Sequence, residues 1–281
     1  MLDLSRLNRF TPWHRLGFHL LAWLEGCLWG ITYPLWMQRR PALRRRYLEY
    51  LRVARYPLPD IGLDQLVPSN LEEDQAVVLK SLAARPGNTS VGELFALALL
   101  AAVIKPHRAL EIGTYDGRSG RAIALQLPPE GRLYTLNLPP DHLEKHPTQR
   151  SSVDAQLSER VTSGYRYHGT EEEARIIQWL GDSRDFDFAV EAPYQYIFID
   201  GGHSYEVVMS DSRRALECID RENGIILWHD ATRFGVRRCL TALRRELPLH
   251  RISGTDLAVL KFHGGAPQSL EGTGDGRGGP A

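Results

Sequence analysis

The sequence contains little cysteine and no excess of charge of either sign. Only three cysteines, Cys27, Cys218 and Cys239, occur in 281 residues, and their separation fits neither a zinc site nor a disulfide framework. This scarcity favours a reducing compartment and a cytoplasmic location. The 34 basic and 34 acidic residues balance, which argues against a nucleic-acid-binding protein, because such proteins show a basic excess.

Long apolar runs are also scarce, and the one candidate lies near the N-terminus. Residues 16–37 have about the length of a membrane span, but His19, Glu25 and Pro34 interrupt them. Tryptophans at 13, 23, 29 and 36 and arginines at 39, 40, 44, 45 and 46 accompany this run. The pattern favours membrane contact through residues 13–46 on the cytoplasmic face, either spanning the bilayer or lying in its interface. A helical pair packed on the rest of the protein or on a second subunit is the alternative, and a homo-oligomer stays open.

Beyond a linker candidate at residues 56–60, strands and helices alternate. Strands are expected at 109–112, 132–137, 174–180, 194–200 and 224–230, and helices at 122 onward, 205–219 and 233–247. Short strands at 249–252 and 257–262 form an expected hairpin. Two further helices are expected before the first strand, one from Ser69 or Asn70 to Ala84 and one over 94–104. The second is preceded by a Ser90–Glu93 capping box.

This alternation predicts an α/β fold with a mostly parallel seven-stranded sheet, helices on both faces and a terminal antiparallel strand. We assign residues 61–263 to this domain and residues 1–60 to an N-terminal helical extension. Residues 264–281 are rich in Gly, Pro and Ser and are expected to be disordered.

The first strand ends in a glycine-rich turn. Gly113, Gly117 and Gly120 separate the strand from a helix, an arrangement with which α/β folds bind nucleotide-like cofactors. The spacing differs from the dinucleotide pattern G-x-G-x-x-G. A tight turn without a ligand is the alternative.

Three stretches together carry a family resemblance. Residues 111–120 (EIGTYDGRSG), 198–206 (FIDGGHSYE) and 224–230 (GIILWHD) resemble class I S-adenosylmethionine-dependent methyltransferases of the methyltransferase-24 family. Relatives in that family include macrolide sugar O-methyltransferases and a cephalosporin-hydroxylase-like group. The resemblance covers roughly residues 90–262 and implies a Rossmann-like methyltransferase fold.

The resemblance also implies a set of cofactor-binding residues. Glu111 and Gly113 would line the methionine part of S-adenosylmethionine, and Asp182 and Ser183 would meet the adenine, unless they belong to an ordinary loop. Asn137 stands where relatives have an acid that binds the ribose, and a simple turn residue is the alternative there. The full set is Glu111, Gly113, Thr114, Tyr115, Gly117, Ser119, Asn137, Asp182, Ser183 and Asp200.

Asp200 and His203 are the predicted catalytic residues. In related sugar O-methyltransferases the matching Asp is a magnesium ligand and the matching His a general base. Relatives also have an acidic pair at the end of the fifth strand, where this chain has His229 and Asp230. Asp200, His229 and Asp230 are therefore the expected Mg²⁺ ligands, although a nitrogen ligand suits Mg²⁺ poorly and metal dependence stays open. Without a metal, Asp200 would orient His203 or bind the cofactor amine, and Asp230 is also expected to position the base.

The main hypothesis is methylation of a hydroxyl on a small molecule, a sugar or a lipid-linked glycan. A second is a cofactor-binding or regulatory module of the same fold that does not methylate, which Asn137 and His229 favour. A third is a nicotinamide oxidoreductase, against which the glycine spacing and the terminal hairpin argue. The sequence decides neither the acceptor nor the oligomeric state.

Overall fold

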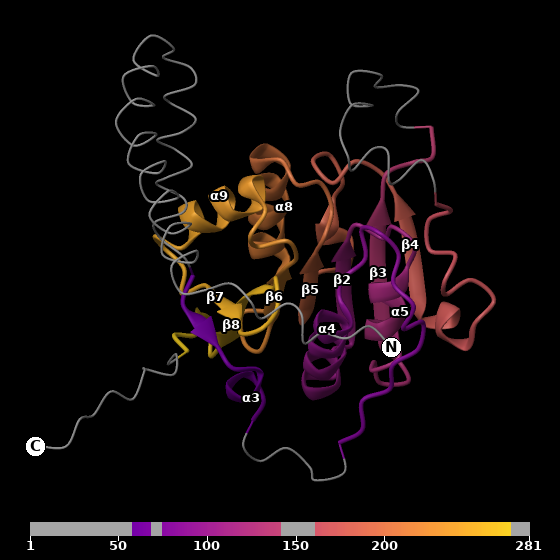
Figure 1. Cartoon of the computed structure of the whole chain (residues 1–281), viewed down its shortest axis with the longest axis horizontal. Helices are drawn as coiled ribbons and strands as arrows, with labels where there is room; N and C mark the ends of the chain where they lie inside the picture. Colours follow the sequence, from indigo (N-terminus) through magenta and orange to yellow (C-terminus); the bar gives the residue numbers. More distant parts are fainter. Residues whose placement is uncertain (1–57, 69–74, 142–160, 271–281) are drawn as a thin grey trace, which may run out of the picture. The chain divides into compact units, whose positions relative to one another are not determined.

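The computed structural model describes residues 58–68, 75–141 and 161–270 of the chain (Figure 1). Within these ranges the chain forms one nine-stranded sheet with helices packed on both faces. The predicted α/β fold class is therefore confirmed.

The sheet is mostly parallel, and its strands lie in the spatial order β1-β7-β8-β6-β5-β2-β3-β4, with β9 paired to β8. The strands are β1 (Asp60–Ile61), β2 (Arg108–Ile112), β3 (Arg132–Asn137), β4 (Ile176–Leu180), β5 (Tyr196–Ile199), β6 (Ile225–Trp228), β7 (His250–Ile252), β8 (Ala258–His263) and β9 (Ala266–Pro267). β8 runs antiparallel to both β6 and β7. The predicted hairpin and its antiparallel strand are therefore confirmed.

The helices form two layers around the sheet (Figure 1). They are α3 (Leu63–Leu66), α4 (Val91–Ile104), α5 (Arg118–Ala124), α8 (Tyr205–Cys218) and α9 (Phe234–Leu243), with short 3₁₀ turns η3 (Glu171–Arg175) and η4 (Phe188–Glu191). Successive strand residues point to opposite faces. Accordingly, Leu110 and Ile112 of β2 pack in the cluster of α8 and α9, whereas Ala109 packs in the cluster of α4 and α5.

The helix that begins near residue 91 forms as the capping box predicts. The Ser90 hydroxyl accepts a hydrogen bond from Glu93 N (3.2 Å), and the Glu93 carboxylate accepts one from Ser90 N (2.6 Å). Other elements are shorter than predicted. β4 begins at Ile176 because residues 171–175 form η3, and α9 ends at Leu243.

The helix predicted up to Ala84 is wrong where the structure describes it, because residues 75–84 form neither helix nor strand. Side chains from the α5 region form hydrogen bonds with backbone carbonyls that would otherwise be paired within a helix. Gln126 Nε2 donates to Val78 O (2.6 Å), and the Arg118 guanidinium donates to Ser81 O and Leu82 O (2.9 and 2.8 Å). These contacts with α5 replace the local helix.

Two very short strands lie where the sequence predicted irregular chain. β1 falls at the end of the expected linker and pairs in parallel with β7. β9 falls within the segment expected to be disordered and pairs with β8. Both lengthen the sheet beyond the seven predicted strands.

The segment predicted to contact a membrane, residues 13–46, lies outside the described residues. Of the helices in the described ranges, none combines the length and the apolar character that crossing a bilayer requires.

Candidate functional site

The predicted site residues lie at or beyond the carboxyl ends of five neighbouring parallel strands, β6, β5, β2, β3 and β4. Backbone hydrogen bonds join these ends in a row: Gly181 N to Asn137 O (2.9 Å), Gly113 N to Leu136 O (2.9 Å), Asp200 N to Ile112 O (2.8 Å) and His229 N to Ile199 O (3.0 Å). The row brings the predicted residues to the edge where open α/β sheets bind ligands.

Gly113 brings the glycine turn directly against the loop that follows β5. Its φ is +106°, a conformation that disfavours any residue with a side chain. A Cβ at this position would collide with the backbone of Asp200 and Gly201. The turn and the loop that contains His203 are therefore in contact through their backbones.

The other two glycines of the turn are packed against the chain itself. A Cβ on Gly117, whose φ is +84°, would lie 2.6 Å from the Tyr167 ring. A Cβ on Gly120 would lie 2.8 Å from Glu111 Oε2. The positive φ and the internal packing are thus enough to require glycine at Gly117, and Gly120 leaves room for the Glu111 carboxylate, whether or not a ligand approaches them.

Glu111 lies beneath the turn with no exposed surface. Its oxygens accept hydrogen bonds from Ser119 Oγ and Thr135 Oγ1, both at 2.6 Å, and Thr114 Oγ1 lies 2.7 Å from Thr135 Oγ1. Burial raises the pKa of Glu111 to about 8, although both hydroxyls favour its charged form. The resemblance placed Glu111 against the ligand, whereas the structure encloses its carboxyl among these hydroxyls.

The residues expected around the ribose and adenine follow β3 and β4. Asn137 is half-buried, and its Nδ2 lies 3.5 Å from Leu138 O. Asp182 is in a forked ion pair with Arg184, with Nε to Oδ1 at 3.0 Å and Nη2 to Oδ2 at 2.5 Å. The charge of Asp182 is therefore balanced by a residue of its own loop.

Asp211 of α8 is a buried acid at this edge that no sequence motif had indicated. It has no exposed surface, and burial raises its pKa to about 6, although the nearby Ser183 hydroxyl favours its charged form. Within the described part of the chain, neither carboxylate oxygen receives a hydrogen bond of normal geometry. A buried acceptor without a donor is costly. This edge therefore fits a ligand, or a water beneath it, that supplies N–H or O–H groups.

His229 lies between two carboxylates. Its Nδ1 is 2.9 Å from Asp200 Oδ1, and its Nε2 is 3.5 Å from Glu93 Oε2. Burial alone would lower the pKa of His229, but the charge and hydrogen bond of Asp200 and the hydrogen bond of Glu93 raise it to about 11. Both carboxylates thus favour the protonated form of the His229 ring.

His203 forms a second pair with Asp230. Its Nε2 is 2.8 Å from Asp230 Oδ2, which also accepts from Arg233 Nη1 at 3.0 Å. Burial would raise the pKa of Asp230, but the hydrogen bond from His203 and the charges of His229, His203 and Arg233 lower it. Of the two carboxylates expected to position the predicted base, Asp230 is therefore the one that contacts His203.

Two site residues other than glycine have a positive φ. Tyr115 has φ +46° and donates its hydroxyl to Pro86 O (3.0 Å), and Asp230 has φ +53°. Such conformations cost about 1–3 kcal/mol and cluster at functional sites. At Asp230 this backbone conformation accompanies the carboxylate's bond to His203.

Glu93 is a second site residue that the sequence interpretation missed. One of its oxygens bonds Ser90 N and faces His229, and the other accepts from Asp256 N at 2.7 Å. Burial would raise the pKa of Glu93, but the hydrogen bonds from His229, Ser90 and Asp256 lower it to about 2. The capping-box pattern explained Glu93 fully, so nothing in the sequence indicated its second contact.

The expected metal ligands Asp200, His229 and Asp230 do not fit a metal ion in this arrangement. A histidine ligand needs an unprotonated nitrogen, and both nitrogens of His229 face carboxylate oxygens. Across the described ranges, no group of three or more His, Cys, Asp and Glu side chains is placed to hold a metal ion.

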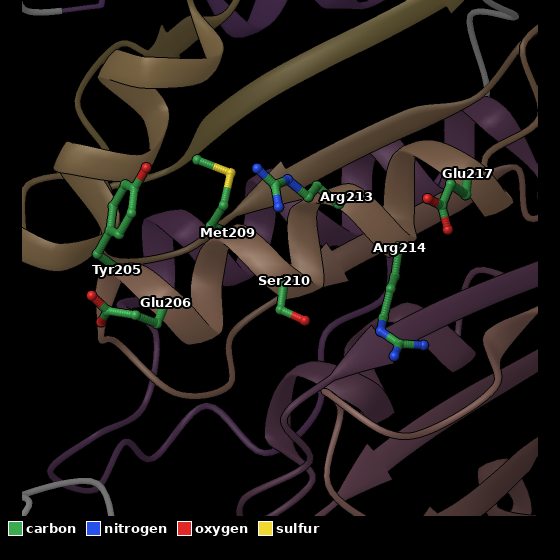
Figure 2. A pocket seen from close by; sticks show the side chains of 7 residues that line it. All are labelled: Tyr205, Glu206, Met209, Ser210, Arg213, Arg214 and Glu217. Carbon is green, nitrogen blue, oxygen red and sulfur yellow. The ribbon is translucent and has the colours of Figure 1, made fainter.

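A cavity of about 540 Å³ lies along α8 (Figure 2). It is lined by Tyr205, Glu206, Met209, Ser210, Arg213, Arg214 and Glu217. All of these residues belong to α8, and none is a predicted site residue. The strand-end site is thus distinct from this cavity.

Comparisons with known proteins relate the part of the chain that contains the strand-end motifs to methyltransferases. The chain is similar in structure to the O-methyltransferase from Bacillus cereus solved with SAH (21% identity, TM-score 0.41, covering 64% of this chain and 82% of that one). It is also similar to the O-methyltransferase TomG from Streptomyces achromogenes solved with SAM (20% identity, TM-score 0.43, covering 78% and 96%). No curated protein matches the sequence. Residues 110–231 match the methyltransferase-24 family model, described as a methyltransferase domain, and these residues include the glycine turn and both histidine pairs. Residues 110–231 therefore form a methyltransferase domain that matches the methyltransferase-24 family model.

Proposed function

We propose that this protein binds S-adenosylmethionine at the strand-end site and transfers its methyl group to a hydroxyl of a small molecule, a sugar or a lipid-linked glycan. The observation that supports this best is the His203–Asp230 pair, in which a histidine is held at 2.8 Å by a carboxylate. The glycine turn touches the same loop through Gly113. A methyl donor and a base are thereby brought to one edge of the sheet.

The reaction would be a direct displacement, for which the donor supplies an electrophilic methyl group on sulfonium sulfur. An electron pair of the acceptor oxygen forms the new O–C bond, while the C–S bond breaks and its pair stays on sulfur. The acceptor proton passes to His203, because a histidine side chain can accept a proton near neutral pH. Asp230 would stabilise the imidazolium that forms.

We infer from the contact with Asp230 which nitrogen of His203 would act. If Nε2 donates to Asp230, Nδ1 is the basic nitrogen of the neutral ring. This atom is shielded from solvent. We therefore infer that acceptor binding shifts the loop in which Gly201 and Gly202 precede His203, because glycines allow such a backbone change at low cost.

We expect different residues to contact the methionine part and the nucleoside part of the cofactor. Gly113 and the residues around it would lie against the methionine part, with the buried Glu111 cluster supporting the turn from below. Asn137 and Ser183 would meet the ribose and adenine, and Asp211 beneath them would supply an acceptor for an N–H or O–H group.

Calorimetric titration tests the cofactor half of this proposal. Wild-type protein should bind S-adenosylmethionine and should not bind NADH, since the glycine spacing is not that of a dinucleotide site. Asp211→Asn should bind the cofactor more weakly, and Glu130→Gln, at an exposed site distant in sequence, is the matched control. Lack of binding to S-adenosylmethionine in folded protein would contradict the proposal.

A transfer assay with labelled S-adenosylmethionine and a panel of hydroxyl acceptors tests the other half. Incorporation of label into a hydroxyl-bearing acceptor is the expected result. Cofactor binding without transfer to any acceptor class would favour the non-methylating regulatory module instead.

A further inference from the structure

The Glu93–His229–Asp200 row places a positive charge where the family resemblance predicted a metal ion. Asp200 Oδ1 and Glu93 Oε2 face the two nitrogens of His229 at 2.9 and 3.5 Å, and Asp230 Oδ1 lies 3.9 Å from Nδ1. Only 9% of His229 is exposed. Three carboxylates therefore surround one imidazole ring in a largely buried site.

The hydrogen-bonding requirements of this row determine the charge of the ring. An ionised carboxylate only accepts hydrogen bonds, and a neutral imidazole donates only one. Asp200 accepts a hydrogen bond at Nδ1, and the Glu93 carboxylate faces Nε2 in an ion pair at 3.5 Å, so a ring protonated at both nitrogens, which is a cation, satisfies both contacts. A ring in this state has no lone pair with which to bind a metal. Its charge already compensates Asp200 and Glu93.

We propose that the His229 imidazolium is the resident cation of this site, and that it replaces the divalent ion which an acidic residue at this position would help to bind. This inference rests on the proposed methyl transfer only for its consequence, which is that transfer needs no divalent metal. The ring neutralises Asp200 and stays fixed to β6, which leaves Asp230 to orient His203.

Metal titration tests the replacement directly. Wild-type protein titrated calorimetrically with MgCl₂, and with MnCl₂ followed by electron paramagnetic resonance, should bind either ion only weakly. His229→Asp adds a carboxylate and removes the cation, so it should bind Mn²⁺ at least tenfold more tightly. His229→Gln removes the charge without adding a ligand and is the matched control.

Two results would overturn the proposal. One is tight binding of Mn²⁺ by the wild type that Asp200→Asn abolishes. The other is a His229→Asp variant, folded by circular dichroism, with no gain in affinity. If the His229→Asp variant does not fold, the rate of methyl transfer by wild-type protein is measured in excess EDTA. A rate that falls at least tenfold in EDTA and recovers when Mg²⁺ is added would contradict the proposal. Binding of S-adenosylmethionine is measured separately, so failure of the proposed function is distinguishable from failure of this inference.

Discussion

His203 has the arrangement of a general base, because a carboxylate fixes one of its nitrogens at 2.8 Å. A positioned base contributes about 10²–10⁴-fold to rate. We therefore expect His203→Ala to lower the rate of methyl transfer by that factor, while the dissociation constant for S-adenosylmethionine changes less than about threefold. Steady-state assay and calorimetry on the same preparation measure the two quantities. Asp230→Asn should lose less rate, because the base remains.

The matched control for His203 is His107→Ala. His107 is largely exposed and lies 3.6 Å from Glu130, in the loop before β2. The His107→Ala variant should transfer the methyl group at the wild-type rate. Equal rates for His203→Ala and wild type would remove His203 from the chemistry and would leave Asp230 as the nearest alternative base.

Glu111 links protonation to folding. Burial raises its pKa from an ordinary value near 4.5 to about 8, so the folded state retains the proton that the unfolded state releases. The resulting stability is complete below about pH 4 and is lost as pH rises towards 8, at up to about 1.4 kcal/mol per pH unit. We expect urea unfolding to show that the free energy of unfolding falls less between pH 5 and pH 8 for Glu111→Gln than for the wild type.

Glu130→Gln serves as the comparison for this pH effect, since its carboxylate is 65% exposed. It should follow the wild type at both pH values. If Glu111→Gln and the wild type lost the same free energy of unfolding between pH 5 and 8, Glu111 would be ionised in the folded state.

At the residue scale, the sequence indicated which strand ends matter but not which side chains pair. Asp200 and His203 are three residues apart, and a turn between them made a pair plausible. In the structure each bonds a partner after β6 instead, Asp200 with His229 and His203 with Asp230. These pairings depend on tertiary contacts between strands, which spacing along one loop does not determine.

At the element scale, α5 organises the segment that precedes α4. Arg118 is fully buried, and its guanidinium donates to the carbonyls of Ser81, Thr89 and Leu82. Each hydrogen bond from a charged donor contributes about 1.5–3 kcal/mol, and unpaired buried carbonyls add a cost. Arg118→Ala should therefore lower the free energy of unfolding by about 3 kcal/mol or more.

Hydrogen exchange distinguishes a local from a global effect of Arg118→Ala. Residues 75–89 should lose protection and become the first site of proteolytic cleavage, because the contacts with α5 that fix their backbone are removed. Arg132→Ala is the control, since its guanidinium bonds only the adjacent Gly131 O in the described contacts. Unchanged protection of residues 75–89 would show that other contacts fix the segment.

Elements with a strong local signal were predictable, and those that depend on distant partners were not. α4 has a capping box and a dense apolar stretch, and α8 has a serine N-cap and an amphipathic pattern, so both formed close to the predicted bounds. Residues 75–84 have an apolar pattern that also suits a helix. Their backbone bonds instead to Arg118 and Gln126, which lie more than 30 residues away in sequence.

At the scale of the whole molecule, the parallel sheet followed from alternating strands and helices, and the terminal antiparallel strand from one short turn signal. β1 and β9 were not predictable because two residues give no periodicity. Their pairing with β7 and β8 depends on strands that are already in place.

The N-terminal extension leads to the last prediction, which rests on composition alone. Tryptophans between residues 13 and 36 and five arginines between 39 and 46 form the pattern of a membrane-contacting segment. We expect the full chain to sediment with anionic vesicles more than with neutral ones, because each arginine near an anionic surface contributes about 1 kcal/mol. Changing Arg39, Arg40 and Arg44 together to Gln should weaken partitioning on the order of a hundredfold.

The control for this charge effect changes Arg132, Arg213 and Arg221 of the methyltransferase domain to Gln, which removes the same charge elsewhere. Extraction at alkaline pH then separates the two forms of contact. An interfacial helix should be released, whereas a spanning helix should stay in the pellet, because its apolar residues remain in the hydrocarbon core. A full chain that stays in the supernatant without detergent in the presence of either vesicle contradicts membrane contact. In that case, the aromatic residues would be explained by packing on the domain or on a second subunit. The oligomeric state of the chain without residues 1–50 would distinguish these two alternatives.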